Sequence, residues 1–453
     1  MSVIIEKERQ TPVLDKADVL VVGSGPGGLS AAIAAARAGV KTILIERYGC
    51  FGGNMTVVGV ESLAWYRHEK TIDSEGIGIE FENRAMEMGA TAKEVQSDSQ
   101  ALNTELFKHV ADTLVTEAGV IPLLHCYGVE PIVEGDTIKG VVTESKSGRL
   151  AVLGKVVIDA TGDADIAFRA GAPCTMEPVP ERQAVTLAFN CCGVNKDRFM
   201  EYIKEDPATY GDWGEDWAQQ TSGLENDMFS PYFQKQFDQA IEKNIIPKSD
   251  WDLCGSWSTI TDDGQATYMN LVHLGKVDIT DVRDLTRAEM DGRRQVLDAI
   301  KAMNHTIPGF EKARLRNYAM TIGTRDSRKI QGEYELTGHD VLNEARFEDS
   351  IGVFPEFVDG FGVLRLPVTG RYFQVPYRSI LPKRIESLLV AGRSIAGDQI
   401  SHAATRNMMC CAVSGQGAGV AAAVAAKSGK PCRQVPVKDI QNVLAEQNVR
   451  CHY

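Results

Sequence analysis

The chain begins with short apolar segments separated by turn residues, a pattern that predicts strands and helices in succession. An apolar, β-branched run at residues 18–22 predicts a buried parallel strand. The alanine-rich stretch "GLSAAIAAARAG" after it predicts a helix that ends at Gly39. The run "KTILIE" predicts a second strand, which ends at Glu46. This order of strand, helix and strand is typical of an α/β fold.

Further along the chain the pattern changes to strict alternation. Residues 128–145, "GVEPIVEGDTIKGVVTES", alternate apolar and polar positions around Gly/Asp turns and predict a β-meander. An apolar strand that begins at residue 156 follows. Two later stretches, 230–244 and 280–304, have the spacing of amphipathic helices. In the second, Thr286 and Glu289 form a plausible N-terminal capping box.

The first turn carries a glycine pattern with a mechanical purpose. Gly23, Gly25 and Gly28 have G-x-G-x-x-G spacing directly after the first predicted strand. The first glycine permits the tight turn, the second lets the backbone approach a pyrophosphate, and the third lets helix and strand pack closely. Glu46 lies 23 residues after Gly23, where a carboxylate accepts hydrogen bonds from ribose hydroxyls. The sequence therefore predicts an ADP-binding unit, which FAD and NAD share.

Two further segments favour a flavin. The stretch "ERYGCFGGNMT" places Gly52 and Gly53 just past the ribose acid, where the chain must run alongside an extended pyrophosphate and ribityl arm. A plain NAD domain has no mechanical need for glycines there. The later strand ends in Ala160-Thr161-Gly162-Asp163, a segment that resembles the A-T-G of two-dinucleotide-fold flavoproteins.

Composition narrows the function class. The 453 residues carry a net charge of −13, which argues against nucleic acid as a partner because that binding relies on clustered Lys and Arg. The sequence contains no run of 18 apolar residues, so it predicts no membrane span. The N-terminus lacks the apolar region of a secretion signal, so we expect a cytoplasmic protein. Self-association into a homo-oligomer stays open.

The ten cysteines contain no C-x-x-C, and the eight histidines show no metal-ligand spacing. Iron–sulfur clusters and structural zinc usually use such spacings, so we expect free thiols and no metal.

Taken together, the motifs resemble the FAD-dependent oxidoreductase family that includes the flavin domains of heterodisulfide reductase A subunits. The likeness to fumarate reductase flavoproteins is more distant. The matching segments include "DVLVVGSGPGGLSAAIAAARAG", "IDATGDADIAFRAGA" and "LLVAGRSIAGDQISHAATRNMMCCAVSGQGAG". The chain lacks the cluster cysteines of the reductase subunits, so their electron-bifurcating role does not carry over.

The resemblance implies a glutathione-reductase-type, Rossmann-like FAD domain with a β-meander, split by an inserted α+β cap domain. We expect the FAD domain at 1–175 and 370–453, and the substrate domain at 176–369. The expected cofactor is FAD. The candidate FAD-binding residues are Gly23, Ser24, Gly25, Pro26, Gly28, Glu46, Arg47, Gly52, Gly53, Asn54, Met55, Val129, Thr161, Gly162, Asp163, Gly392, Arg393, Gly415, Gln416 and Gly417.

The inserted region contains Trp213, Trp217, Trp251 and Trp257, which form either the core of the cap or an aromatic wall over a substrate. Its segment "GTRDSRKIQGEY" is dense in charge. Arg325 and Arg328 have the spacing of a bidentate carboxylate clamp, with Asp326 to orient either of them. A structural ion-pair cluster is the alternative.

Near the C-terminus, "SGQGAG" repeats part of the dinucleotide fingerprint. A second nucleotide half would need a further strand, helix and strand, and only 14 residues follow Asp439, so we expect no second site. Instead, we expect Ser414 to cap a helix that begins near Gly415 and Gln416. Its free N–H groups would point at the N1–C2=O edge of the flavin.

Several residues near this helix are candidates for catalysis. His402 has the chemistry to exchange a proton near neutral pH, and Arg406 to fix an anionic charge. Tyr377 and Arg378, from "VPYRSILP", are candidates for the same cavity. The adjacent Cys410 and Cys411 fit disulfide geometry poorly, so we interpret them as packing residues under the flavin.

The sequence thus predicts an FAD-dependent oxidoreductase that moves hydride between a small organic substrate and flavin N5. The alternatives are a flavin electron-transfer subunit of a larger complex and a flavin-dependent isomerase. The second electron acceptor is open among oxygen, quinone, nicotinamide and protein.

Overall fold

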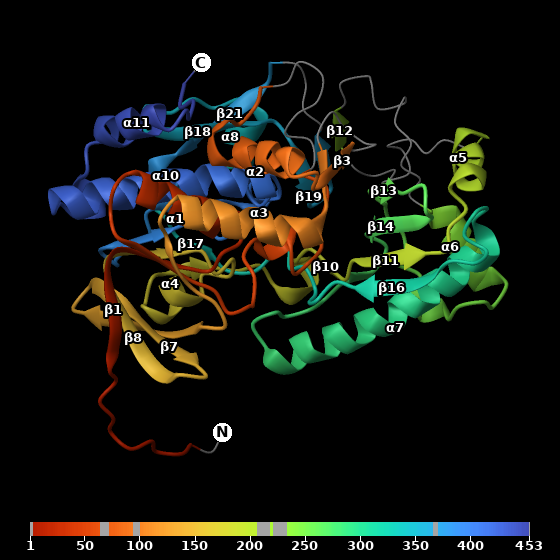
Figure 1. The fold of residues 1–453 in the computed structure, drawn as a ribbon, viewed down its shortest axis with the longest axis horizontal. Coiled ribbons are helices and arrows are strands. Elements are labelled where there is room, and N and C mark those ends of the chain that lie inside the picture. The colour runs from red at the N-terminus through yellow and green to blue at the C-terminus, as the bar shows by residue number, and fades with distance from the viewer. Residues whose placement is uncertain are drawn as a thin grey trace.

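A computed structural model describes residues 3–63, 72–93, 100–205, 218–220, 233–365 and 370–452. Its largest element is a seven-stranded sheet in the order β5-β2-β1-β8-β7-β6, with β22 also paired to β8 (Figure 1). The parallel strands are β1 (Val13–Val22), β2 (Thr42–Ile45), β5 (Ile121–Leu123), β8 (Gly148–Asp159) and β22 (Leu388–Val390). The expected α/β, Rossmann-like fold is confirmed.

The long strand β8 joins the two halves of this sheet. Its first half pairs antiparallel with β7 (Thr137–Ser145), which pairs in turn with β6 (Tyr127–Glu134). Its last three residues pair parallel with β22 from the C-terminal part of the chain. The predicted β-meander is therefore confirmed, and strands far apart in sequence complete one sheet.

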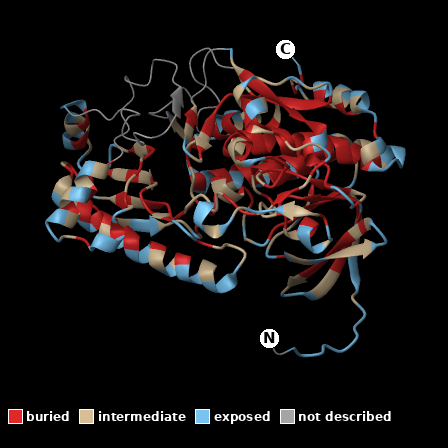
Figure 2. Ribbon diagram, turned by 180° about the vertical axis from the view of Figure 1, so that it is seen from behind, coloured by how far each residue is buried: buried red, intermediate tan, exposed pale blue. Residues whose placement is uncertain are grey.

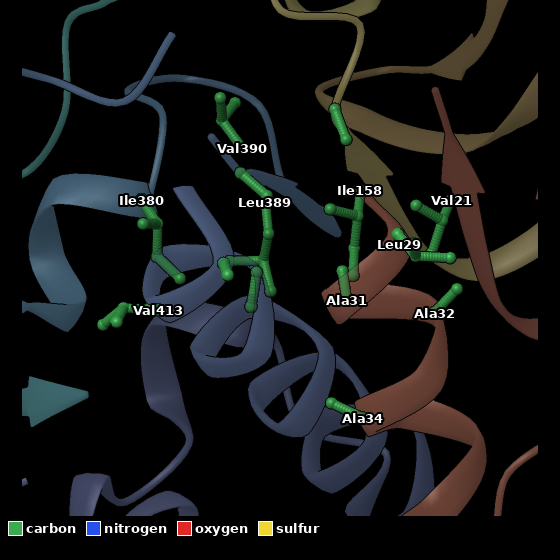
Figure 3. Packing of buried hydrophobic residues seen from close by; sticks show 14 of the residues in the cluster. Val21, Leu29, Ala31, Ala32, Ala34, Ile158, Ile380, Leu389, Val390 and Val413 are labelled. Atoms are coloured by element: carbon green, nitrogen blue, oxygen red, sulfur yellow. The ribbon is translucent and has the colours of Figure 1, made fainter. Parts of the chain in front are cut away.

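Helices α1 (Pro26–Arg37) and α10 (Met408–Ser428) pack side by side next to this sheet, and Figure 3 shows Ala31 and Ala34 of α1 beside α10. The contact is backbone to backbone. A Cβ added to Gly415 would lie 2.0 Å from the carbonyl oxygen of Gly27. A Cβ on Gly419 would lie 2.2 Å from that of Ala31.

The prediction of a helix start near Gly415 is wrong. Helix α10 begins at Met408 after the N-cap Asn407, so Gly415, Gln416 and Gly417 lie inside it. Ser414 caps nothing, because its hydroxyl accepts the N–H of Gly392 instead, at 3.0 Å. The glycines serve helix packing, since only glycine admits so close a helix–helix contact.

The remaining elements around the first core are short, apart from three helices. They are α2 (Gly76–Glu87), β3 (Thr91–Lys93), β4 (Gln100–Leu102), α3 (Thr104–Glu117), α4 (Asp165–Arg169), β9 (Cys174–Thr175), β17 (Lys329–Ile330), α8 (Gly338–Leu342), β18 (Ser350–Pro355), β19 (Val358–Gly360), β20 (Val363–Arg365), β21 (Tyr372–Pro376), α9 (Gln399–Thr405) and α11 (Val437–Glu446). Among the described residues, α10 alone has the length and composition of a membrane span, and it is mostly buried inside the protein.

The inserted region has a hydrophobic core of its own, between Val185 and Ile322. Its largest sheet is β13-β14-β11-β16, and the long helix α7 packs on it with one buried and one exposed face (Figure 2). Its elements are β10 (Val185–Thr186), β11 (Phe189–Cys192), α5 (Lys196–Glu205), β12 (Ala218–Gln220), α6 (Gln234–Glu242), β13 (Thr259–Ile260), β14 (Gln265–Met269), β15 (His273–Leu274), α7 (Val282–Thr306) and β16 (Arg314–Tyr318).

Two details of this region differ from the sequence-based expectation. Residues from Ile330 onward pack in the first core, so the insertion ends before residue 330 and not at 369. Asp281 caps α7 in place of Thr286, through the N–H groups of Arg283 and Asp284.

The tryptophans divide between the two interpretations. Trp257 is buried in the cap core against Phe199, with ring centroids 5.4 Å apart, whereas Trp251 is 70% exposed. Neither lines the cavity described below. Trp213 and Trp217 lie outside the described residues.

Candidate active site

A cavity of about 620 Å³ lies between the two cores. Its wall includes residues 22–27, 45–48, 53–54, 160–163 and 391–393 from the first core, and residues 256, 268, 270, 279–280 and 321–325 from the inserted region and its edge. One partly open cavity therefore joins the predicted nucleotide-binding segments to side chains of the insertion.

The glycine-rich turn forms one end of this cavity. Gly23 has φ of +97°, and a Cβ there would lie 2.4 Å from the carbonyl oxygen of Ala160. A Cβ on Gly28 would lie 1.9 Å from the carbonyl oxygen of Gly23, whereas Gly25 faces open space. Helix α1 begins at Pro26 without a side-chain cap. Its first turn at the cavity wall thus presents N–H groups and a positive dipole end, which suit a pyrophosphate.

Glu46 holds this turn in place and is itself part of the wall. One carboxylate oxygen accepts the N–H and the hydroxyl of Ser24, at 2.9 and 2.6 Å, and the other accepts the N–H of Tyr48 at 2.9 Å. The oxygen that accepts from Tyr48 has a second lone pair for a ribose hydroxyl. Arg47, beside it, extends over the Tyr48 ring at the same end of the cavity.

The second glycine pair packs directly on the first turn. Gly52 has φ of +108°, and its N–H donates to the carbonyl of Ser24 at 2.9 Å. A Cβ on Gly53 would lie 2.7 Å from Cα of Gly25. Gly53 and Asn54 reach the cavity, whereas Gly52 and the fully buried Met55 support them from behind.

The A-T-G-D segment after β8 and the loop after β22 meet at the centre of the cavity. Arg393 donates to the carbonyl of Gly162 at 2.8 Å, and its guanidinium also contacts Asp163 and Thr324. The Asp163 carboxylate accepts the hydroxyl of Ser327 at 2.6 Å. This network connects the nucleotide-binding sheet to the segment that carries Arg325.

Several expected cofactor contacts do not reach the cavity. The carbonyl of Val129 accepts a hydrogen bond from Arg169 at 2.9 Å, and Val129 is not part of the wall. Gln416 accepts the N–H of Ile77 at 2.8 Å, deep in the first core. Gly415 and Gly417 pack against Gly27 and Ile351, as described for α10.

His402 does not line the cavity, so the structure does not support its expected catalytic role. It is 1% exposed, and its Nε2 donates to the backbone carbonyl of Arg325 at 2.9 Å. Burial lowers the pKa of His402 well below its usual range, with Lys329 nearby adding to the effect. The imidazole is therefore neutral and fixed, and it holds a loop of the cavity from behind.

Tyr377 and Arg378 are also outside the wall. The hydroxyl of Tyr377 donates to the carbonyl of Cys432 at 2.9 Å, and burial raises the pKa of Tyr377 well above its usual range. Arg378 pairs with Asp349 at 2.9 Å on a half-exposed surface. Their sequence proximity to the flavin-binding strand did not translate into spatial proximity.

The three other arginine candidates do reach the cavity. Arg328 pairs with Asp165 at 3.0 Å and lies over the Phe168 ring, and Arg406 pairs with Asp359 at 3.2 Å. Burial lowers the pKa of Arg406. Arg325 also lines the wall, without an ion pair among the described residues. The two arginines of the predicted clamp thus differ: Arg328 is paired with an acid and Arg325 is not.

The sequence analysis missed the polar side chains that β14 and its neighbours contribute. Tyr268 and Asn270 lie in or just after this short strand and line the cavity, as does Ser256. A five-residue strand gives no sequence signal that distinguishes cavity-facing polar residues from surface ones. Tyr268 does have a positive φ of 48°, which only the structure reveals.

The adjacent cysteines behave as packing residues. Cys410 is buried, and Cys411 touches the cavity with its thiol near the carbonyls of Thr405 and Arg406. Burial raises the pKa of Cys411 to about 12, so the thiol stays protonated. All ten cysteines are free, and within the described ranges no three acidic, cysteine or histidine side chains form a metal-ligand group.

The fold and the cavity define a dinucleotide-binding flavoprotein. The open face of Gly25, the uncapped start of α1 and the Glu46 carboxylate fit the pyrophosphate and ribose of FAD. The chain belongs to the FAD-dependent oxidoreductase family, whose model matches residues 18–444. Its cofactor is FAD.

Curated relatives match one third of the chain. A thiamine thiazole synthase of Saccharolobus islandicus (strain L.S.2.15) is 30% identical over 163 residues, which are 33% of this chain and 57% of the relative. One from Metallosphaera sedula is 29% identical over 161 residues, 33% of this chain and 55% of the relative. The chain thus spans just over half the length of the curated relatives that it matches.

Two solved structures align over most of the chain. A geranylgeranyl bacteriochlorophyll reductase-like protein from Thermoplasma acidophilum is 15% identical and covers 96% of this chain and 84% of its own, at a TM-score of 0.47. The flavin-dependent brominase Bmp2 is 14% identical with the same coverage, at a TM-score of 0.49. These low scores carry no argument about the reaction of this protein.

Proposed function

We propose that this protein is an FAD-dependent dehydrogenase or reductase that moves hydride between a small organic substrate and FAD. The observation that carries the proposal is the single cavity of about 620 Å³, which connects the nucleotide-binding turn to Tyr268, Asn270 and Arg325. Its size is ordinary for a small-molecule site. Bound FAD supplies a two-electron acceptor or donor at the flavin ring.

The protein's own residues divide this work between the two ends of the cavity. At one end, the first turn of α1 binds the pyrophosphate and Glu46 orients the ribose. At the other end, side chains of the inserted region and the segment around Arg325 bind and orient the substrate. Apolar residues such as Val57 and Ile322 exclude water from the space between the ends.

Anaerobic flavin reduction tests this proposal and separates it from the two alternatives. The holoprotein is mixed with NADH, NADPH and a panel of small alcohols, amines and acids, and the visible flavin absorbance is followed. Hydride transfer predicts bleaching with one donor, and a slower rate when deuterium replaces hydrogen at the donor carbon. Bleaching without an isotope effect would favour an electron-transfer subunit. Product formation without net bleaching would favour an isomerase.

A further inference from the structure

The arginines at the substrate end of the cavity are unequally neutralised. Three are paired with one aspartate each: Arg328 with Asp165, Arg393 with Asp163 and Arg406 with Asp359. Arg325 lines the same wall and, within the described ranges, forms no ion pair or side-chain hydrogen bond. Arg325 thus brings to the wall a positive charge with no acid partner within the described ranges. Arg47 and Arg169 also line the wall without an ion pair there, but Arg47 lies over the Tyr48 ring and Arg169 donates to the carbonyl of Val129.

The neighbouring acid is directed away from Arg325. The Asp326 carboxylate is fully buried and lies 3.3 Å from the buried ammonium group of Lys329. Asp326 therefore does not orient the arginines, as the sequence had suggested it would. His402 donates to the backbone carbonyl of Arg325, which fixes the loop in this orientation. The unbalanced charge is a built feature of the loop.

The charge of Arg325 acts on two neighbours. Burial is the main cause that lowers the pKa of Arg406; Asp359 opposes this shift, and Arg325 adds to it. Burial likewise lowers the pKa of His273 to about 3, with Arg325 as the second cause. Because Arg325 disfavours positive charge on both neighbours, an anion beside it would relieve repulsion and gain a charge-assisted hydrogen bond.

Asn270 is a second indication that a ligand binds here. Its side-chain oxygen is buried, lies on the cavity wall and has no hydrogen-bond partner among the described residues. Buried polar atoms are nearly always satisfied by protein, water or ligand. Because this oxygen only accepts hydrogen bonds, it suits a hydroxyl or N–H donor elsewhere on the ligand and not an acid group.

Apolar side chains form a large part of the wall, which disfavours a fully hydrated ion as the ligand. The wall includes Val57, Val58, Ile279, Leu285, Ile322 and Phe357. An inorganic anion would lose its hydration shell here and gain little from such side chains. An organic acid would place its carbon body against them and gain from burial of apolar area.

We propose that the substrate is an organic carboxylate, which binds by its acid group to Arg325 and by its carbon body to the apolar wall. The proposal deepens the proposed function and rests on the same cavity. Arg328 and Arg406, already paired, shape the site without binding the acid group. A bidentate contact to Arg325 fixes the distance and angle of the carbon body relative to the flavin.

Ligand binding to the FAD-replete protein tests this proposal, with perturbation of the visible flavin spectrum as the readout. The probes are acetate, benzoate, benzamide and inorganic phosphate. We expect benzoate to bind more tightly than benzamide, which has the same ring without the charge. We also expect benzoate to bind more tightly than acetate and phosphate, which lack the ring. Arg325→Gln should weaken benzoate by at least roughly tenfold, since a charge-assisted bond is lost.

The matched control is Arg316→Gln, which removes the same charge from an exposed position on β16, outside the cavity wall. It should leave all four affinities unchanged. Arg325→Gln should leave benzamide binding and FAD content unchanged, which shows that the variant is folded. Equal loss of benzoate and benzamide in Arg325→Gln would overturn the proposal. So would phosphate binding as tight as benzoate, or a wild-type protein that binds neither acetate nor benzoate.

These outcomes are separate from those of the proposed function. Carboxylate binding that depends on Arg325, together with a flavin that no donor reduces, would sustain this inference and refute the dehydrogenase. Flavin reduction by an uncharged donor, unaffected by Arg325→Gln, would do the reverse.

Discussion

The packing of α10 on α1 makes a quantitative prediction about Gly415. In Gly415→Ala the new Cβ would lie 2.0 Å from the carbonyl oxygen of Gly27, whereas non-bonded carbons rest at about 3.5 Å from their neighbours. Backbone atoms cannot rotate away, so the two helices must separate by roughly 1 Å or more. Such overpacking costs typically 1–3 kcal/mol.

The same substitution has an opposing benefit within the helix. Alanine is favoured over glycine in a helix interior by about 1 kcal/mol. Because the clash is with backbone, we take the upper end of the overpacking range and expect a net loss of about 2 kcal/mol. The shift also moves Gly27 at the start of α1, which lines the cavity, so FAD should bind more weakly.

Gly417→Ala is the matched control in the same helix. There the new Cβ meets one side chain only: the terminal methyl carbon of Ile351 at 2.5 Å, which can change rotamer, and its Cβ at 2.8 Å, which moves only with the backbone. We expect a smaller net loss than in Gly415→Ala and normal FAD retention. Denaturant unfolding and FAD content after gel filtration measure both effects. A Gly415→Ala variant that is as stable as Gly417→Ala and keeps its FAD would refute the packing argument.

Three further predictions follow from the site. Glu46→Arg should weaken FAD at least roughly tenfold, because the charge-assisted bond to the ribose and the bonds that hold Ser24 are lost and a bulky cation is added. Unchanged FAD occupancy after dialysis would contradict the ribose assignment. His402 is neutral when folded but titrates near pH 6.5 when unfolded, so its contribution to stability is full above that pH and falls as the pH drops below it. The difference in unfolding free energy between wild type and His402→Gln should therefore shrink by up to about 1.4 kcal/mol per pH unit below pH 6.5. Denaturant unfolding at several pH values measures this difference. A difference that does not change with pH would mean that the imidazole is protonated in the folded protein. Arg378→Gln breaks only a half-exposed ion pair with Asp349, so flavin reduction should be unchanged within twofold in stopped-flow, and a large loss would return Arg378 to the active site.

The first nucleotide-binding turn could be predicted from sequence because its determinants are local. Gly23 and Gly28 are needed by the turn itself, and Glu46 closes it from the next strand. The positive φ of Gly23, the contact of Gly28 with Gly23 and the bonds of Glu46 to Ser24 all act within about 25 residues of chain, and a spacing pattern captures them.

The C-terminal glycines could not be interpreted in the same way. A run of small residues is compatible with a helix start at a ligand and with a close contact between two helices. What decides between them is Gly27, nearly 390 residues away from Gly415 in sequence and in backbone contact with it in space. Local spacing carries no information about that partner.

Whether each charged candidate lies at the cavity, and whether it is paired there, has a related cause. Residue type and spacing suggested a clamp of Arg325 and Arg328, and a proton relay at His402. The outcome depended on the ion-pair partner of each side chain. Arg328 pairs with Asp165, and Asp326 pairs with Lys329. Ion-pair partners come from distant segments, so the choice between a free and a paired arginine is a tertiary property.

The discontinuous sheet also constrains the order of events on the ribosome. The inserted region has its own core between Val185 and Ile322, and it has the contacts to fold as soon as that segment emerges. The nucleotide-binding part must wait, because β22 and α10 emerge more than 350 residues after β1 and α1. During that interval the last three residues of β8 pair with β1 alone and lack β22 on their other side, and α1 lacks its helical partner. FAD thus meets a complete binding site only late in synthesis, and the nascent chain exposes an apolar surface until then.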